Sequence, residues 1–146
     1  MEEKPIIYTI EDVKRFLKEG RCLEDVAWKG GMFKGVDLSK KNLSNADLRN
    51  ADLRDANLEE AILKNADLTG ADLTGATLTR ANLESAKLNN AILDRAHLNR
   101  SNLFLASFEN ASLYNAHLRR ANIDKANFTG ANLRESYLDG LLGLKT

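Results

Sequence analysis

One feature dominates the sequence: an apolar residue stands at every fifth position from Leu38 to Leu138. Eighteen of these 21 residues are Leu, and the others are one Ile and two Phe. A second series lies two residues before the first, and between positions 46 and 131 it holds Ala at 17 of 18 places, with Ser101 as the exception. Such a strict period indicates a repeat architecture, in which each repeat buries its apolar side against its neighbours.

The five-residue spacing excludes most regular structures. Because an α-helix turns about 100° per residue, a five-residue step would scatter the leucines around the helix. In a straight β-strand an odd step sends successive side chains to opposite faces. The leucines share one interior only if the chain turns a corner in every pentad. Four corners close a square coil of about 20 residues, and stacked coils would pair their backbones about 4.8 Å apart.

Several pentads share the motif A(D/N)LXX. Residues 46–50 are ADLRN, residues 51–55 are ADLRD, and residues 66–70 and 71–75 are both ADLTG. Over residues 31–140 the chain resembles the pentapeptide-repeat proteins. This resemblance implies an all-β solenoid, a right-handed quadrilateral β-helix of about five to six coils.

The two ends of such a solenoid expose apolar layers and need covering. Residues 1–30 are expected to form an N-terminal cap with a short helix near residues 10–19, because Thr9 and Asp12 resemble a helix-capping pair and apolar residues follow on one helical face. Cys22 is interpreted as a packing residue. Residues 141–146 form a C-terminal tail, which either folds over the last coil or pairs with another subunit. The expected state is a monomer or a weak homodimer through an exposed end.

Composition restricts the class of protein. The 146 residues suit one domain, and 21 Lys and Arg balance 21 Asp and Glu, which disfavours a general binder of polyanions. A single cysteine excludes an internal disulfide and a cysteine-cluster metal site. No apolar run approaches the length of about 20 residues that a membrane-spanning helix needs. Because the first five residues lack the features of a signal peptide, a cytoplasmic protein is expected.

Catalysis is not expected, because the interior is filled by Leu and Ala and the outer faces are flat. His97 and His117 lie one coil apart at equivalent positions, but Asn57 and Tyr137 in the same column are poor third ligands for a metal ion. The repeated aspartates, such as Asp47, invite a calcium site. The resemblance instead implies that they bond the backbone and the neighbouring coils. We therefore expect no catalytic residues, no cofactor and no metal ion.

Two functions from different classes follow. Flat, regular faces favour a protein-interaction or scaffold module with an unknown protein partner, and the regular motif is similar to that of many cyanobacterial members of unassigned role. The alternative is a DNA-mimicking modulator of DNA gyrase, a role that some members of the family have. The zero net charge opposes this alternative, as does the confinement of the acidity: residues 36–75 carry a net charge of −3 and residues 76–146 a net charge of +3.

Two candidate interaction surfaces stand out among the outward positions. The first is an arginine ridge for an anionic partner: Arg80, Arg100 and Arg120 are spaced by 20 residues and should stack along one edge. The rest of this candidate site lies nearby and comprises Arg95, Arg119, His97 and His117. Few acidic residues are expected beside these cations to relieve their repulsion, and binding of nucleic acid should be weak and sensitive to salt.

The second candidate surface is apolar. Phe104 and Leu105 occupy outward positions where polar residues are the rule, and Ile62 lies on the same face two coils earlier. Such residues are either tolerated singly, covered by the C-terminal tail, or used in a homotypic or partner contact.

Overall fold

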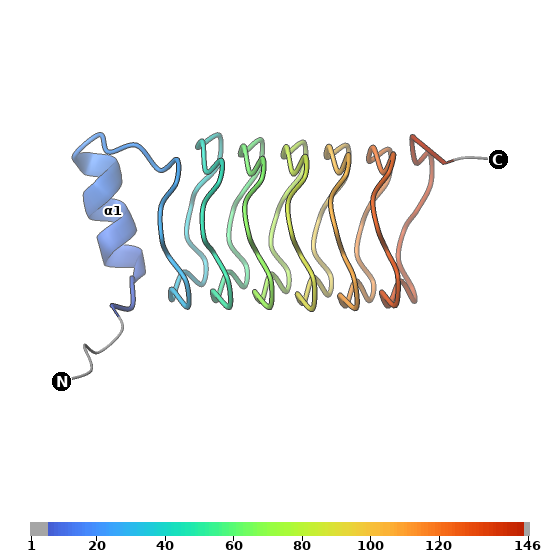
Figure 1. The fold of residues 1–146 in the computed structure, drawn as a ribbon, viewed down its shortest axis with the longest axis horizontal. Coiled ribbons are helices and arrows are strands. Elements are labelled where there is room, and N and C mark those ends of the chain that lie inside the picture. Colours follow the sequence, from blue (N-terminus) through green and yellow to red (C-terminus); the bar gives the residue numbers. More distant parts are fainter. Residues whose placement is uncertain (1–5, 145–146) are drawn as a thin grey trace.

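The computed structural model describes residues 6–144 and shows a rod of stacked coils with one helix across its N-terminal end (Figure 1). Helix α1 spans Ile10–Lys18, and a series of parallel β-bridges follows it as far as Leu142. Residues 1–5 of the expected cap and 145–146 of the expected tail lie outside the described residues. Within residues 6–144, no helix has the length and apolar character needed to cross a membrane.

The coils are joined backbone to backbone at intervals of 20 residues. Asp47 forms a parallel bridge with Asp67, and Asp67 forms the next one with Lys87. Leu48 donates its backbone N–H to the carbonyl of Asp67 at 2.8 Å, and Asp67 donates in the other direction to the carbonyl of Ala46 at 2.9 Å. The pentads of the inner coils repeat this pattern with the coils before and after them, so the expected 20-residue step is present.

Each pentad ends in a tight turn whose geometry the sequence analysis did not anticipate. Every fifth residue from Asp25 to Gly140 has a φ between 55° and 71°, which is the left-handed region. The backbone N–H of the residue after it closes the turn, as when Ala51 donates to the carbonyl of Leu48 at 3.1 Å. This is the arrangement of a type II turn. The sequence did carry the signal, since six of these 24 positions are Gly and eight are Asn or Asp.

The interior follows the two apolar series. From Leu38 to Leu118, every residue of the leucine series is at most 1% exposed. Ser101, in the alanine series, is also buried, and its Oγ donates to the carbonyl of Leu98 at 2.7 Å. Gly31 holds an alanine position near the start, where a Cβ would lie 2.1 Å from the ring of Phe33. The large rings of the first coil therefore require a smaller residue at the neighbouring corner.

Helix α1 covers the N-terminal layer. The Thr9 backbone N–H donates to the Asp12 carboxylate at 2.8 Å, which forms half of a capping box at the start of the helix. The helix buries Val13 and Phe16, and the Phe16 ring stacks on Trp28 of the ragged first coil at 5.9 Å between centroids. The helix lies where the sequence analysis expects one. Cys22 is exposed, so its interpretation as a packing residue is wrong.

The C-terminal layer has no such cover among the described residues. Phe128 and Leu133 are only partly buried, and Leu138 is 39% exposed although it continues the core series. Leu142 bridges to Asn122 and accepts a hydrogen bond from the Ile123 N–H at 2.9 Å. This part of the tail thus extends the coil instead of folding over it, and the alternative that the tail pairs with another subunit stays a prediction.

Replacement of Leu73 by Ala tests the inward assignment of the leucine series. Leu73 is fully buried between layers of the same kind, so the variant should lose about 2–5 kcal/mol of unfolding free energy. Thr74→Ala on the neighbouring outward position is the matched control and should cost less than about 1 kcal/mol. Chemical denaturation measures both values. Equal, small losses would contradict the assignment.

Candidate functional site

One face of the rod gathers the predicted histidines. His97 and His117 form a parallel bridge, and His117 forms the next one with Tyr137. Their rings lie one above the other, with centroids 4.7 Å apart for the two histidines and 4.4 Å apart for His117 and Tyr137. The Arg119 guanidinium lies 5.0 Å from the centre of the Tyr137 ring. We call His97, His117 and Tyr137 the aromatic column.

His117, in the middle of the aromatic column, favours its neutral form. Burial lowers the pKa of His117 below its usual 6.5, and the neighbouring His97 and Arg119 lower it further because they oppose a second positive charge. Protonation at lower pH would add cations to a face that already carries arginines. The charge of this face therefore depends on pH.

The arginine ridge lies on the corner beside this column, and its backbone is held by the coils. Arg80 donates its N–H to the carbonyl of Asn99, and Arg100 donates to the carbonyl of Arg119 at 2.9 Å. Arg80, Arg100 and Arg120 all have positive φ, so each stands at the left-handed position of its turn. Arg95 has the same conformation at the corner on the other side of His97. Cations thus stand at both corners of the face that carries the aromatic column.

Few acidic residues are expected beside this ridge, and two of its members have an acidic partner. Arg80 lies 3.8 Å from a carboxylate oxygen of Glu60, and Arg119 pairs with Asp139 at 3.0 Å. For Arg95, Arg100 and Arg120, residues 6–144 offer no carboxylate within 4.0 Å. These three arginines are the cations of the ridge that remain available to an external anion.

The apolar candidates do not form one patch. Leu105 is 47% exposed, and the half-buried ring of Phe104 lies 5.5 Å from the Lys125 ammonium. Ile62 is separated from them by Asn82 and Asn102, whose side chains hydrogen-bond to each other at 3.1 Å. The contact surface predicted from these residues is therefore reduced to Phe104 and Leu105.

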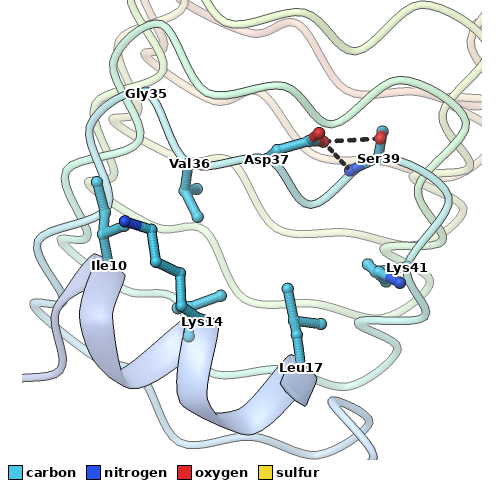
Figure 2. Close-up of a pocket in the computed structure, with 9 residues that line it drawn as sticks. Ile10, Lys14, Leu17, Gly35, Val36, Asp37, Ser39 and Lys41 are labelled. Atoms are coloured by element: carbon cyan, nitrogen blue, oxygen red, sulfur yellow. Dashed lines mark hydrogen bonds between the residues drawn. The ribbon is translucent and has the colours of Figure 1, made fainter. Parts of the chain in front are cut away.

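A filled interior and flat outer faces predict no pocket, and this prediction is wrong at the N-terminal end. A half-open cavity of about 520 Å³ lies between α1 and the first coil (Figure 2). Side chains of α1 project towards the segment that carries Val36 and Asp37. No sequence signal locates this cavity, because it depends on how the helix lies across the coil. Its lining comprises Ile10, Val13, Lys14, Leu17, Gly35, Val36, Asp37, Ser39 and Lys41.

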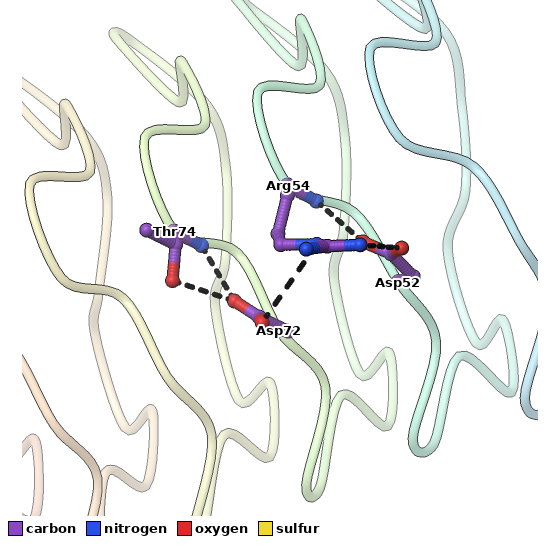
Figure 3. Close-up of polar contacts among 4 residues, drawn as sticks. All are labelled: Asp52, Arg54, Asp72 and Thr74. Carbon is purple, nitrogen blue, oxygen red and sulfur yellow. Dashed lines mark hydrogen bonds and ion pairs between the residues drawn. The ribbon is translucent and has the colours of Figure 1, made fainter.

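The repeated aspartates bond their own turns. Asp52 accepts from the Arg54 backbone N–H at 3.2 Å and from its guanidinium at 2.8 and 2.7 Å, and Arg54 also lies 4.0 Å from Asp72 (Figure 3). These contacts hold the pKa of Asp52 below its usual value. Asp72 accepts from the backbone N–H of Thr74 at 3.0 Å and from its hydroxyl at 2.6 Å. In the part of the chain that the structure describes, no three His, Cys, Asp or Glu residues are grouped to hold a metal ion.

Leu105→Gly tests whether the exposed leucine has a packing role. A leucine in the left-handed region is strained by about 1 kcal/mol, and an exposed side chain loses little burial when it is removed. The unfolding free energy should therefore stay the same or rise by up to about 1 kcal/mol. Leu103→Gly on the buried neighbour should lower it by more than about 3 kcal/mol. A comparable loss at both positions in denaturant titrations would show that Leu105 packs.

The histidine pair predicts a pH dependence of stability. Because the folded pKa of His117 is lowered from 6.5, the unfolded chain binds the proton more tightly. The contribution is complete above pH 6.5 and is lost as the pH falls towards the lower, folded pKa. His117→Asn should flatten the melting temperature between pH 5 and 8, whereas the wild type should lose stability on acidification. A histidine titration by NMR checks the shift directly, and a pKa at or above 6.5 would contradict it.

The chain is similar to several proteins of known structure. The chain is 31% identical to HetL, a pentapeptide repeat protein involved in heterocyst differentiation regulation from the cyanobacterium Nostoc sp. strain PCC 7120; the match covers 84% of this chain and 70% of HetL, with a TM-score of 0.47. A pentapeptide repeat protein from the Arabidopsis thaliana thylakoid lumen is 28% identical, over 71% of this chain and 69% of that one, with a TM-score of 0.52.

A third solved structure is more distant. QnrB1, a plasmid-mediated fluoroquinolone resistance protein, is 19% identical over 79% of this chain and 63% of its own, with a TM-score of 0.52, so it shares the fold alone. No curated protein sequence matches the chain significantly. The family model described as "Pentapeptide repeats (8 copies)" matches residues 33–65, 61–100 and 101–140. With most of its length matched by this model, the chain belongs to the pentapeptide-repeat family, whose solenoid its coils form.

Proposed function

We propose that the chain is a non-enzymatic interaction module that binds an acidic protein partner through the face of the aromatic column. The observation that carries this proposal is the placement of Arg95 and Arg100 at the two corners that bound this face, each without a carboxylate partner among residues 6–144. Partner carboxylates would pair with Arg95 at one corner and with Arg100 at the other and lie across the rings between them, an arrangement that suits electrostatic recognition. The proposed setting is the cytoplasm.

The same face offers little to a substrate. His97 is exposed, and the column lies on the outside of a solenoid whose interior is filled. Catalytic groups act in concave and partly dry sites, where hydrogen bonds and charges are strong. An interaction role needs only a regular surface with fixed side-chain spacing, which repeat proteins supply.

A second candidate is a DNA-mimicking modulator of DNA gyrase. It is favoured by the acidic stretch at residues 36–75 and by the solenoid fold shared with QnrB1. Against it, Arg49 and Arg54 pair with Asp47 and Asp52, which neutralises two of the carboxylates that would imitate phosphates. A gyrase supercoiling assay separates the two proposals, because the interaction module should have no effect at micromolar concentration.

Charge reversal at Arg100 tests the proposed acidic partner. Binding of a fluorescent oligoglutamate peptide at low salt should weaken by at least about tenfold in Arg100→Glu, since an attraction is replaced by a repulsion. The melting temperature should not fall, because the guanidinium forms no ion pair within the described chain. Lys87→Glu, an exposed position whose pentad lies two corners away, changes net charge equally and is the matched control.

The comparison of the two variants decides the outcome. A loss confined to Arg100→Glu supports the face, and an equal loss in Lys87→Glu would reduce the binding to general electrostatics and overturn the proposal. Capture experiments with the wild type and both variants then identify the natural partner.

A further inference from the structure

The face of the aromatic column changes its sign of charge along the rod. Its middle column is joined coil to coil by parallel bridges and runs through Asp37, Asn57, Thr77, His97 and His117. In the two coils before Thr77, the face and its corners carry four carboxylates and one cation: Asp37, Asp55, Glu59, Glu60 and Lys40. In the two coils after Thr77, the same positions carry four arginines and no carboxylate: Arg95, Arg100, Arg119 and Arg120. One face thus presents an acidic stretch followed by a basic one.

The carboxylates of the acidic stretch are available for an external partner. Within residues 6–144, Asp55 and Glu59 have no cation within 4.0 Å, and Glu60 lies 3.8 Å from Arg80. A Cβ at Gly75 would lie 2.6 Å from Oδ1 of Asp55, so this carboxylate lies over the corner at Gly75, towards the basic stretch. The chain therefore leaves most of the charge on both stretches without a partner of its own.

The sign changes at the row with the smallest outward side chains. This row begins at the corner residue Gly75 and continues with the half-buried Thr77 and Thr79. Only Arg80, at its far corner, is long. The row therefore has no bulky side chain in its middle that would hold a second flat face away.

We propose that the acidic partner of this face is a second copy of the chain, which packs on it in antiparallel orientation about a two-fold axis at Thr77. This inference rests on the proposed function, because it uses the same face and names its partner. A two-fold axis that crosses the face at right angles to the rod brings each column against itself in reverse order. Residues one coil before Thr77 then meet residues one coil after it on the second copy.

The charges match in this register. Asp55 meets Arg95 of the second copy at one corner, and Glu60 meets Arg100 of the second copy at the other. Two coils from the axis, the carboxylate of Asp37 meets the imidazole of His117 of the second copy. Each contact occurs twice because the interface is symmetric. Contacts between exposed charges are individually weak, so we expect an association that is weak and sensitive to salt.

Two contacts between cations oppose this register only slightly. Arg80 meets its own copy at the corner, where the carboxylate of Glu60 in each chain offsets the repulsion. Lys40 meets Arg120 of the second copy at the end of the overlap, where both exposed side chains can turn into solvent.

A shift of the axis by half a coil gives a poorer match. Arg80 would then meet Arg100 of the second copy, and Asp55 would meet the uncharged Asn115 of the second copy. The register with the axis at Thr77 is therefore the one that the charges favour.

A charge exchange between Glu60 and Arg100 tests the antiparallel contact. In sedimentation experiments at about 20 mM salt, the wild type should associate as its concentration rises, and about 0.5 M salt should abolish the effect. Arg100→Glu and Glu60→Arg should each weaken association at least about tenfold, since each places like charges opposite one another. The double variant has the net charge of the wild type and should regain the association, because Arg at position 60 then meets Glu at position 100.

Lys87→Glu and Glu109→Arg are the matched controls, because they make the same changes of net charge at exposed positions on the opposite face. Both should associate as the wild type does. A wild type that stays monomeric at low salt would overturn the proposal. So would a folded double variant that does not regain association, because Glu60 and Arg100 would then not meet.

A residue on a two-fold axis meets itself, which gives a second test. Thr77→Arg and Thr77→Asp should each associate less than the wild type, whereas an equimolar mixture of the two should associate more than either alone. The control pair, Ser107→Arg and Ser107→Asp on the opposite face, should show no gain on mixing beyond its own separate values. An equal gain for both pairs would assign the effect to net charge and refute the axis at Thr77.

Peptide binding separates this inference from the proposed function. Glu60→Arg retains Arg95 and Arg100, so it should bind the fluorescent oligoglutamate peptide at least as tightly as the wild type, although it no longer associates with itself. A wild type that binds the peptide and stays monomeric would leave the proposed function in place and overturn this inference alone. Loss of peptide binding together with a successful charge exchange would instead show that the face recognises the spacing of the second copy and not acidic chains in general.

Discussion

The backbone hydrogen bonds between coils are the interaction on which the structure depends. Leu48 bonds forward to Asp67, and Asp67 bonds back to Ala46, and the same exchange recurs at each 20-residue step. These bonds can form only if every pentad turns the same corner, which the left-handed fifth residue achieves. Leu and Ala then fill an interior whose shape the backbone has already set. Outward side chains inherit a fixed spacing, so residues one coil apart, such as His97 and His117, must stack.

This constraint also determines where charge can gather. Arg100 stands at a strained corner position that Gly, Asn or Asp would occupy at less cost, and the chain nevertheless has arginine there in three successive coils. Asp52, in contrast, has a partner: Arg54, two residues later in the same pentad, pairs with its carboxylate and neutralises it. The rod therefore has a cationic face in its C-terminal half and an acidic half in which some of the carboxylates are paired with arginines. Complementarity of this kind determines the choice of partner more than the strength of binding.

The features that depend on local or repeated spacing could be predicted from the sequence. The leucine period led to the coil, and the Thr9 and Asp12 pair led to the helix, since both depend on local spacing. Features that depend on a single long-range placement were missed. The cavity between α1 and the first coil exists because of how the helix lies across the coil, which no periodicity encodes. The Arg80 and Glu60 pair was not predicted, because acids were expected only beside the ridge, whereas Glu60 lies in the ridge's own column, one coil earlier.

The contrast between the two ends has a mechanical consequence. Aromatic packing around Phe16 and Trp28 anchors the N-terminal layer, whereas Leu133 and Leu138 at the other end are partly exposed to solvent. In a molecule whose coils contact only their neighbours, the weakest terminal layer separates first and exposes the next one. Pulled along its axis, the rod would therefore unwind coil by coil from the C-terminal side, with Phe108 stacked on Phe128 as the first large resistance. The rod would therefore resist force unequally at its two ends, and the end that carries α1 would unfold last.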